Sequence, residues 1–168
     1  MHVQSPGWTV QATAVRSTLS KQAGDQLELD VTSSQPGIVT VLLWGKDQQL
    51  YKLLPNALFK NPSVPAGHTV RIGLSPNPAK AKVGLGFDAG TSHLLVIVSA
   101  KAREYSGDLA DRDLGFIAVD PAATRTARIN LHDTRSQALP VLAGYVSDCQ
   151  QNSCDRFGAT QLNIELVD

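Results

Sequence analysis

Two apolar runs set the architecture of this sequence: Ile38-Val39-Thr40-Val41-Leu42-Leu43-Trp44 and Leu94-Leu95-Val96-Ile97-Val98. Thr40 is the one polar residue in the first run, and the second run has none. Short apolar runs bounded by turn residues fit strands that are buried on both faces. We therefore expect both runs to be strands at the centres of the sheets.

Around these runs, apolar and polar residues alternate with a period of two. This spacing is typical of strands with one buried and one solvated face. The apolar positions of the alternating segments are Trp8, Val10, Ala12 and Ala14; Leu27, Leu29 and Val31; Val70, Ile72 and Leu74; Ala127, Ile129 and Leu131; and Leu162, Ile164 and Leu166. Gly- and Pro-rich turns separate the segments, including a stiff loop predicted over Lys60–Gly67. The pattern predicts one all-β domain over residues 1–168, an Ig-like β-sandwich.

Two segments depart from the period of two and predict short helical turns within this sandwich. Tyr105–Leu114 could begin a turn with Ser106 or Asp108 as its N-cap. A second turn could start at Pro121, in Pro121–Arg125.

The composition excludes several classes of protein. A chain of 168 residues usually forms one domain. Its 15 Lys and Arg balance 15 Asp and Glu, whereas a general nucleic-acid binder needs an excess of cations. The longest apolar run, Leu94–Val98, is far too short to span a membrane, so this segment is not expected to insert into one.

The two cysteines, Cys149 and Cys154, bear on the compartment. No further cysteine completes a four-thiolate zinc site, and the four histidines are scattered. A disulfide across this short polar loop is the favoured interpretation, with two free cytosolic thiols as the alternative. Because disulfides persist in oxidising compartments, we expect the periplasm or the cell exterior.

The first residues, Met1–Gly7, contain no basic start and no apolar run, and so no signal peptide. With an extracytoplasmic location, this pattern indicates a domain excised from a larger protein. Its export signal or membrane anchor would then lie upstream, and a membrane span outside this segment would tether it.

The known motifs of catalysis and cofactor binding are not found. There is no Walker phosphate loop and no Gly-x-Ser-x-Gly elbow, and Gly84–Gly90 lacks the dinucleotide spacing. His93 begins an apolar strand and is expected to be a strand-end residue. The acidic cluster of Asp108, Asp111 and Asp113 lacks the glycine and distal glutamate of a calcium loop, so a solvated turn is favoured. We expect no catalytic residues, no metal site and no cofactor.

The loop Leu54-Pro55-Asn56-Ala57-Leu58-Phe59-Lys60 is the candidate contact for a protein partner, through Leu54, Pro55, Asn56 and Phe59. It is apolar for a loop, and exposed apolar patches often mark recognition sites. The alternative is that Leu58 and Phe59 close the open end of the core.

Two glycines are predicted to have backbone roles. Gly67 would reverse the chain at positive φ, and Gly158 would bend the last strand or form a bulge in it.

A family resemblance follows from the order of four motifs. They are the apolar strand after Gly37, the element Leu53-Leu54-Pro55-Asn56, the turn Ala66-Gly67 before a further strand, and the terminal Phe157-Gly158-Ala159. This order resembles a bacterial family of domains of unknown function. Its members are often appended to Ser/Thr protein kinases or caspase-like peptidases, and they have no agreed catalytic residues. The resemblance covers most of the chain from about Leu27 and implies an accessory module.

Together, these observations predict a non-catalytic, extracytoplasmic sensor or protein-interaction domain. It would be the periplasmic part of a bacterial transmembrane Ser/Thr kinase. A free periplasmic binding, inhibitor or immunity-type protein is the alternative, and a small hydrolase with a triad assembled from distant residues is a more remote one.

Overall fold

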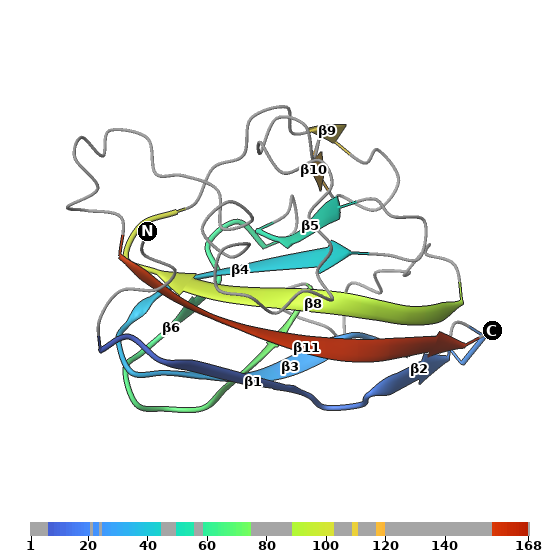
Figure 1. Cartoon of the computed structure of the whole chain (residues 1–168), viewed down its shortest axis with the longest axis horizontal. Coiled ribbons are helices and arrows are strands. Elements are labelled where there is room, and N and C mark those ends of the chain that lie inside the picture. The colour runs from blue at the N-terminus through green and yellow to red at the C-terminus, as the bar shows by residue number, and fades with distance from the viewer. Residues whose placement is uncertain are drawn as a thin grey trace.

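The computed structural model describes residues 7–20, 22–23, 25–44, 50–55, 59–74, 89–102, 109–110, 117–119 and 156–167. All regular elements in this part of the chain are strands, and they form two sheets (Figure 1). The prediction of an all-β sandwich is confirmed. Several predicted features lie outside the described residues: Asn56, Leu58, the acidic cluster, the turn at Pro121, the strand around Ile129, Cys149 and Cys154.

The smaller sheet has three antiparallel strands in the order β1-β3-β7. They are β1 (Val10–Ala14), β3 (Glu28–Ser33) and β7 (Val70–Gly73). Burial alternates strictly along β3, where Leu29 and Val31 are buried and Asp30 and Thr32 face away from the core. This is the half-solvated pattern that the period of two predicts.

The larger sheet has eight strands and contains both apolar runs. Seven of its strands follow the order β2 (Thr18–Ser20), β11 (Phe157–Val167), β8 (Gly90–Ser99), β4 (Gly37–Trp44), β5 (Leu50–Leu54), β10 (Ile117–Val119) and β9 (Leu109–Ala110). The eighth, β6 (Ser63–Val64), pairs with the start of β4. Every pairing in this sheet is antiparallel except β2 with β11.

The strand order resembles that of an Ig-like sandwich. Such folds place the first, second, fourth and fifth strands in one sheet and the third, sixth and seventh in the other. Here β1, β3 and β7 correspond to the first, second and fifth strands, and β4, β8 and β11 to the third, sixth and seventh, while no described strand occupies the fourth position beside β7. The first strand is split between the sheets: β1 pairs with β3, and after Val15–Ser17 the chain joins β11 as β2 (Figure 1).

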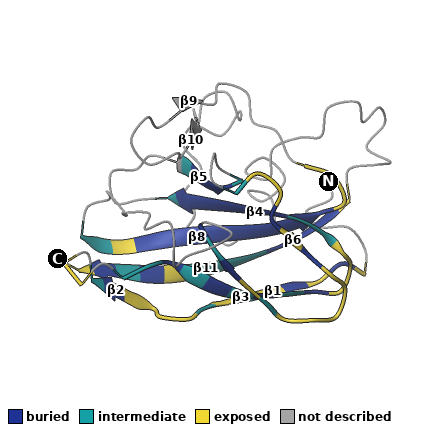
Figure 2. Cartoon of the chain, turned by 180° about the vertical axis from the view of Figure 1, so that it is seen from behind, coloured by how far each residue is buried: buried dark blue, intermediate teal, exposed yellow. Residues whose placement is uncertain are grey.

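The core lies between the sheets, but the second face of the larger sheet is buried as well. Leu94, Val96 and Val98 of β8 belong to the core cluster between the sheets. Leu95 and Ile97 alternate with these residues and so point to the other face, and both have no exposed surface. Figure 2 shows most of β8 as buried. The prediction that both apolar runs are covered on both faces is confirmed.

The structure corrects three local predictions. Leu109 and Ala110, within the predicted helical turn, form β9 instead, because pairing with β10 satisfies their backbone across the sheet. The predicted stiff loop Lys60–Gly67 contains the short strand β6. β11 pairs with β8 in unbroken register from Phe157 to Leu166, so Gly158 makes no bulge.

Gly158 is needed for a close approach between layers. A Cβ atom there would lie 2.6 Å from Trp8 Cδ1 and 2.9 Å from Val10 Cγ2. The bulge is in the β4–β5 pair, where the register shifts between Val41 and Leu42. At Gly67 the prediction of positive φ is confirmed, with a φ of 74°.

The described part of the chain contains no apolar helix of the length that a membrane crossing requires.

Candidate functional site

The predicted partner loop begins where β5 ends. Leu54 is buried, with 1% of its surface exposed, and joins the core cluster beside Leu53. Pro55 is half-buried, and Phe59 is half-buried and packs against the core. Leu54 is therefore a core residue and is not accessible to a partner. Of the described residues of this loop predicted to contact a partner, only Pro55 and Phe59 have exposed surface for it.

Replacing Phe59 by alanine separates the two interpretations of this loop. If the ring closes the core, we expect the free energy of unfolding in urea to fall by about 2–4 kcal/mol, because packed aromatic surface is lost. If the ring is a partner contact, stability should change by less than about 0.5 kcal/mol. Lys60→Ala, an exposed neighbour, is the matched control.

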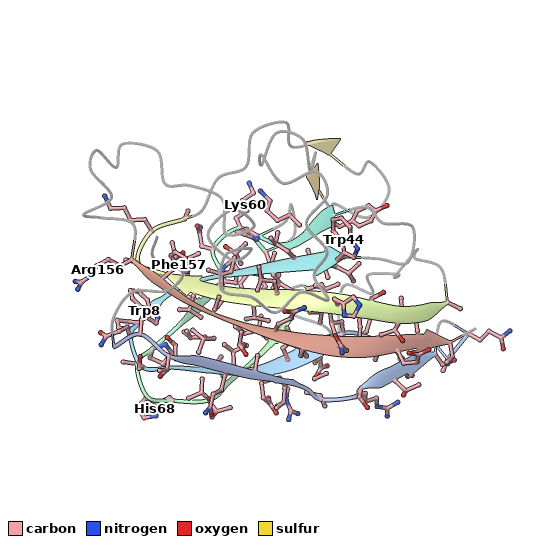
Figure 3. The ribbon with its side chains drawn as sticks, viewed as in Figure 1. Trp8, Trp44, Lys60, His68, Arg156 and Phe157 are labelled. Carbon is pink, nitrogen blue, oxygen red and sulfur yellow. The ribbon has the colours of Figure 1, made fainter. Side chains whose placement is uncertain are left out.

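A second candidate is a polar row on the second face of the larger sheet. The strand register places Trp44, His93 and Asn163 side by side across β4, β8 and β11. Thr91 and Glu165 form the next pair on the same face. Figure 3 shows Trp44 at the right-hand end of β4, whereas Trp8 and Phe157 lie near the left-hand end of the sheets.

His93 is held in place by its neighbour on β11. Its Nδ1–H donates to Asn163 Oδ1 at 2.5 Å, and 7% of the residue is exposed. An amide oxygen only accepts hydrogen bonds, so this contact places the proton of a neutral imidazole on Nδ1. Burial and this contact make His93 a packed structural residue. The prediction of a strand-end residue is wrong, because β8 begins at Gly90 and His93 is paired on both sides, with Asn163 and Trp44.

The Thr91–Glu165 pair is also engaged within the sheet, because Thr91 Oγ1 donates to Glu165 Oε2 at 2.6 Å. Among the described residues, no group of three or more His, Cys, Asp or Glu side chains could hold a metal ion. The row thus offers a fixed imidazole, an amide and a carboxylate, and their contacts join β8 to β11. The sequence could not reveal these pairs, because His93 and Asn163 are 70 residues apart and meet only through the register.

Changing Asn163 to alanine tests the structural role of the row. Loss of Oδ1 removes the acceptor of a buried imidazole N–H, which typically costs about 1–3 kcal/mol. We expect that loss in urea unfolding, together with a change in the ¹⁵N chemical shifts of the His93 ring. Thr160→Ala, which is half-buried on the same strand, serves as a control. Unchanged ring shifts would contradict the pairing.

The outer face of the smaller sheet carries a solvated ion pair. Arg71 Nε and Nη2 donate to the two carboxylate oxygens of Asp30 at 3.0 and 3.3 Å. This hydrogen bonding and the charge of Asp30 raise the pKa of Arg71 above its usual value. A base whose pKa is raised by folding adds stability at every pH below its unfolded pKa, so the shift of Arg71 contributes no pH dependence near neutrality. Its role is to join β3 to β7 on a surface that screens it.

Trp8 and Ser33 make a buried contact between the chain entering β1 and the end of β3. Trp8 Nε1–H donates to Ser33 Oγ at 3.1 Å, and the Ser33 hydroxyl donates to the Gln35 carbonyl at 2.6 Å. The indole thus satisfies its one donor while its ring packs over Gly158. The polar groups of Trp8 and Ser33 therefore hold the start of β1 against the end of β3.

Comparison with known proteins yields one match. Residues 21–102, just under half of the chain, match the family model described as "Domain of unknown function (DUF4384)". The matched stretch contains β3 through β8, and so both central strands of the larger sheet. No curated protein and no solved structure is significantly similar to the chain.

Proposed function

From the similarity of residues 21–102 to a domain family of unknown function, we propose that this chain is a non-catalytic sensor or protein-interaction module. Its place would be outside the cytoplasmic membrane, as the periplasmic part of a bacterial transmembrane Ser/Thr kinase. Binding there would bias the kinase only if the partner has different affinities for two kinase states.

One observation supports the absence of catalysis most directly. In the described part of the chain, five pairs of polar side chains form hydrogen bonds that connect neighbouring segments. They are Trp8–Ser33, Arg16–Asp25, Asp30–Arg71, Thr91–Glu165 and His93–Asn163. Catalysis instead needs a nucleophile, a base and a stabilising donor that converge on one point. A sandwich whose larger sheet is buried on both faces suits a rigid module that offers its loops and edges to a partner.

The location rests on the two cysteines, which lie outside the described residues. Reporter fusions to the full-length protein test this location. Each reporter is joined directly after the residue that is Asp168 in the present numbering. Alkaline phosphatase, which needs an oxidising compartment to form its disulfides, should be active, and β-galactosidase should not. An active β-galactosidase fusion would refute the extracytoplasmic placement.

The kinase connection is tested in the same full-length protein. An upstream kinase domain and membrane span are expected, and deleting residues 1–168 should leave basal autophosphorylation intact while removing its response to envelope conditions. A lone signal peptide upstream would instead favour the alternative, a free periplasmic binding, inhibitor or immunity-type protein.

A further inference from the structure

The outer edge of the smaller sheet is formed by β1, which pairs on one side with β3. Two contacts define which backbone groups face β3: Val15 N–H donates to the Glu28 carbonyl, and Ser34 N–H donates to the Thr9 carbonyl, both at 2.9 Å. Antiparallel pairs alternate between hydrogen-bonded and open positions. The N–H and C=O groups of Val10, Ala12 and Ala14 therefore point away from β3, toward an edge with which no other strand in the described part of the chain pairs.

This edge is accessible and uncharged. Gln11 and Thr13 are exposed, and Ala12 and Ala14 are half-buried. Val15, which follows the strand, is 41% exposed and is one of two large exposed hydrophobic residues in the described part of the chain. Natural sheet edges are usually protected by charges, prolines or bulges, and β1 has none of these between Thr9 and Val15.

The opposite edge of the same sheet shows the contrast. β7 has four residues, and the exposed Arg71 lies at its middle on the solvated face. Two copies that paired through β7 about Arg71 would bring two like charges together, which opposes association. Within this sheet, self-pairing is therefore disfavoured at β7 and open at β1.

We propose that two copies of this chain associate through β1, in antiparallel register about a two-fold axis at Ala12. The open backbone groups of Val10, Ala12 and Ala14 would then form about six hydrogen bonds between the copies. The smaller sheets would join into one continuous sheet, an isologous contact.

The side chains of β1 suit this register on both faces. On the solvated face, Gln11 of one copy lies opposite Thr13 of the other, and both are uncharged. On the core face, Val10 lies opposite Ala14, a large residue opposite a small one. Val15, just beyond the strand, lies opposite Thr9, which pairs two β-branched side chains. Arg16 lies beyond this segment, and the register places it opposite Trp8, so no like charges meet across the axis.

Sedimentation of the whole chain from about 10 µM to about 1 mM tests the association. We expect a monomer–dimer equilibrium in the upper micromolar range, because strand pairing buries less area than a permanent dimer. A chain that remains monomeric throughout would overturn the proposal.

Charge exchange tests the register. Gln11→Lys with Thr13→Lys puts two like-charged pairs across the axis, and should weaken dimerisation at least about tenfold. Gln11→Glu with Thr13→Glu should do the same, while an equimolar mixture of the two variants should form a heterodimer. Failure of the mixture to associate would refute this register.

Two further variants exclude trivial outcomes. Ser63→Lys with His68→Lys adds the same charge at exposed positions away from β1, and should dimerise like the unmodified chain. If it does not, general charge repulsion explains the lysine result and the proposal fails.

Ala12→Pro removes an outward N–H without removing a bond to β3, so it should be folded by circular dichroism and monomeric. A folded, dimeric Ala12→Pro chain would place the interface elsewhere.

Pairing of two copies requires neither a kinase domain nor an extracytoplasmic location. The dimer could therefore fail while both reporter and deletion experiments succeed, and the reverse also holds.

Discussion

Replacing either Leu94 or Leu95 by alanine is expected to lower the free energy of unfolding by about 2–5 kcal/mol. The two side chains point to opposite faces of β8, and neither has any exposed surface. Leu94 packs between the sheets, while Leu95 lies on the other face of the larger sheet. If one face of β8 were solvated, only one of these two substitutions would lower the free energy of unfolding by this amount.

Urea unfolding at a constant m-value measures both effects. Thr13→Ala, on the exposed face of β1, is the matched control and should change stability by less than about 0.5 kcal/mol. A small loss for Leu95→Ala would show that the second face of the sheet contributes little to the folded state. That outcome would contradict the two-faced burial of the larger sheet.

Gly37→Ala is the second large effect. A Cβ atom at this position would lie 2.5 Å from the Ser99 carbonyl oxygen and 2.9 Å from Val98 Cγ1. The nearest atom belongs to the backbone of the central strand β8, which cannot rotate away as a flexible side chain can. We expect a loss of about 1–3 kcal/mol, the usual cost of overpacking.

Gly67→Ala separates this steric effect from backbone strain. Gly67 has a φ of 74°, but a Cβ atom added there would have no neighbouring atom within 4 Å, so its substitution should cost about 1–2 kcal/mol through strain alone. Crystals or NMR spectra of the Gly37→Ala chain should show the β4–β8 pair displaced near Ser99. An unperturbed pair with full stability would contradict the close approach.

Much of the fold follows from local patterns. The alternations around Leu29, Ile72 and Ile164 predict half-solvated strands, and the structure contains all three. Side-chain direction alternates along every strand, so a single buried face imprints a period of two on the sequence. Gly67 is a similar case, because its positive φ is a local property of one turn.

The candidate site depended on information that local patterns do not hold. The partner loop could be found from its apolar residues, but burial of Leu54 in the core depends on the bulge opposite Val41. The contact of His93 with Asn163 likewise depends on how β8 and β11 are aligned. A shift of one residue in that register would put the two side chains on different faces.

Local patterns along the chain define its fold class: strands, their buried faces and the two central runs at Ile38–Trp44 and Leu94–Val98. Tertiary structure decided which strands pair, and with that the role of single residues. Gly158 makes room for the Trp8 ring and forms no bulge, and Leu109 belongs to a sheet and not to a helical turn. The reason is physical: side-chain alternation is set within one strand, whereas register and close approach are set by residues far apart in the chain.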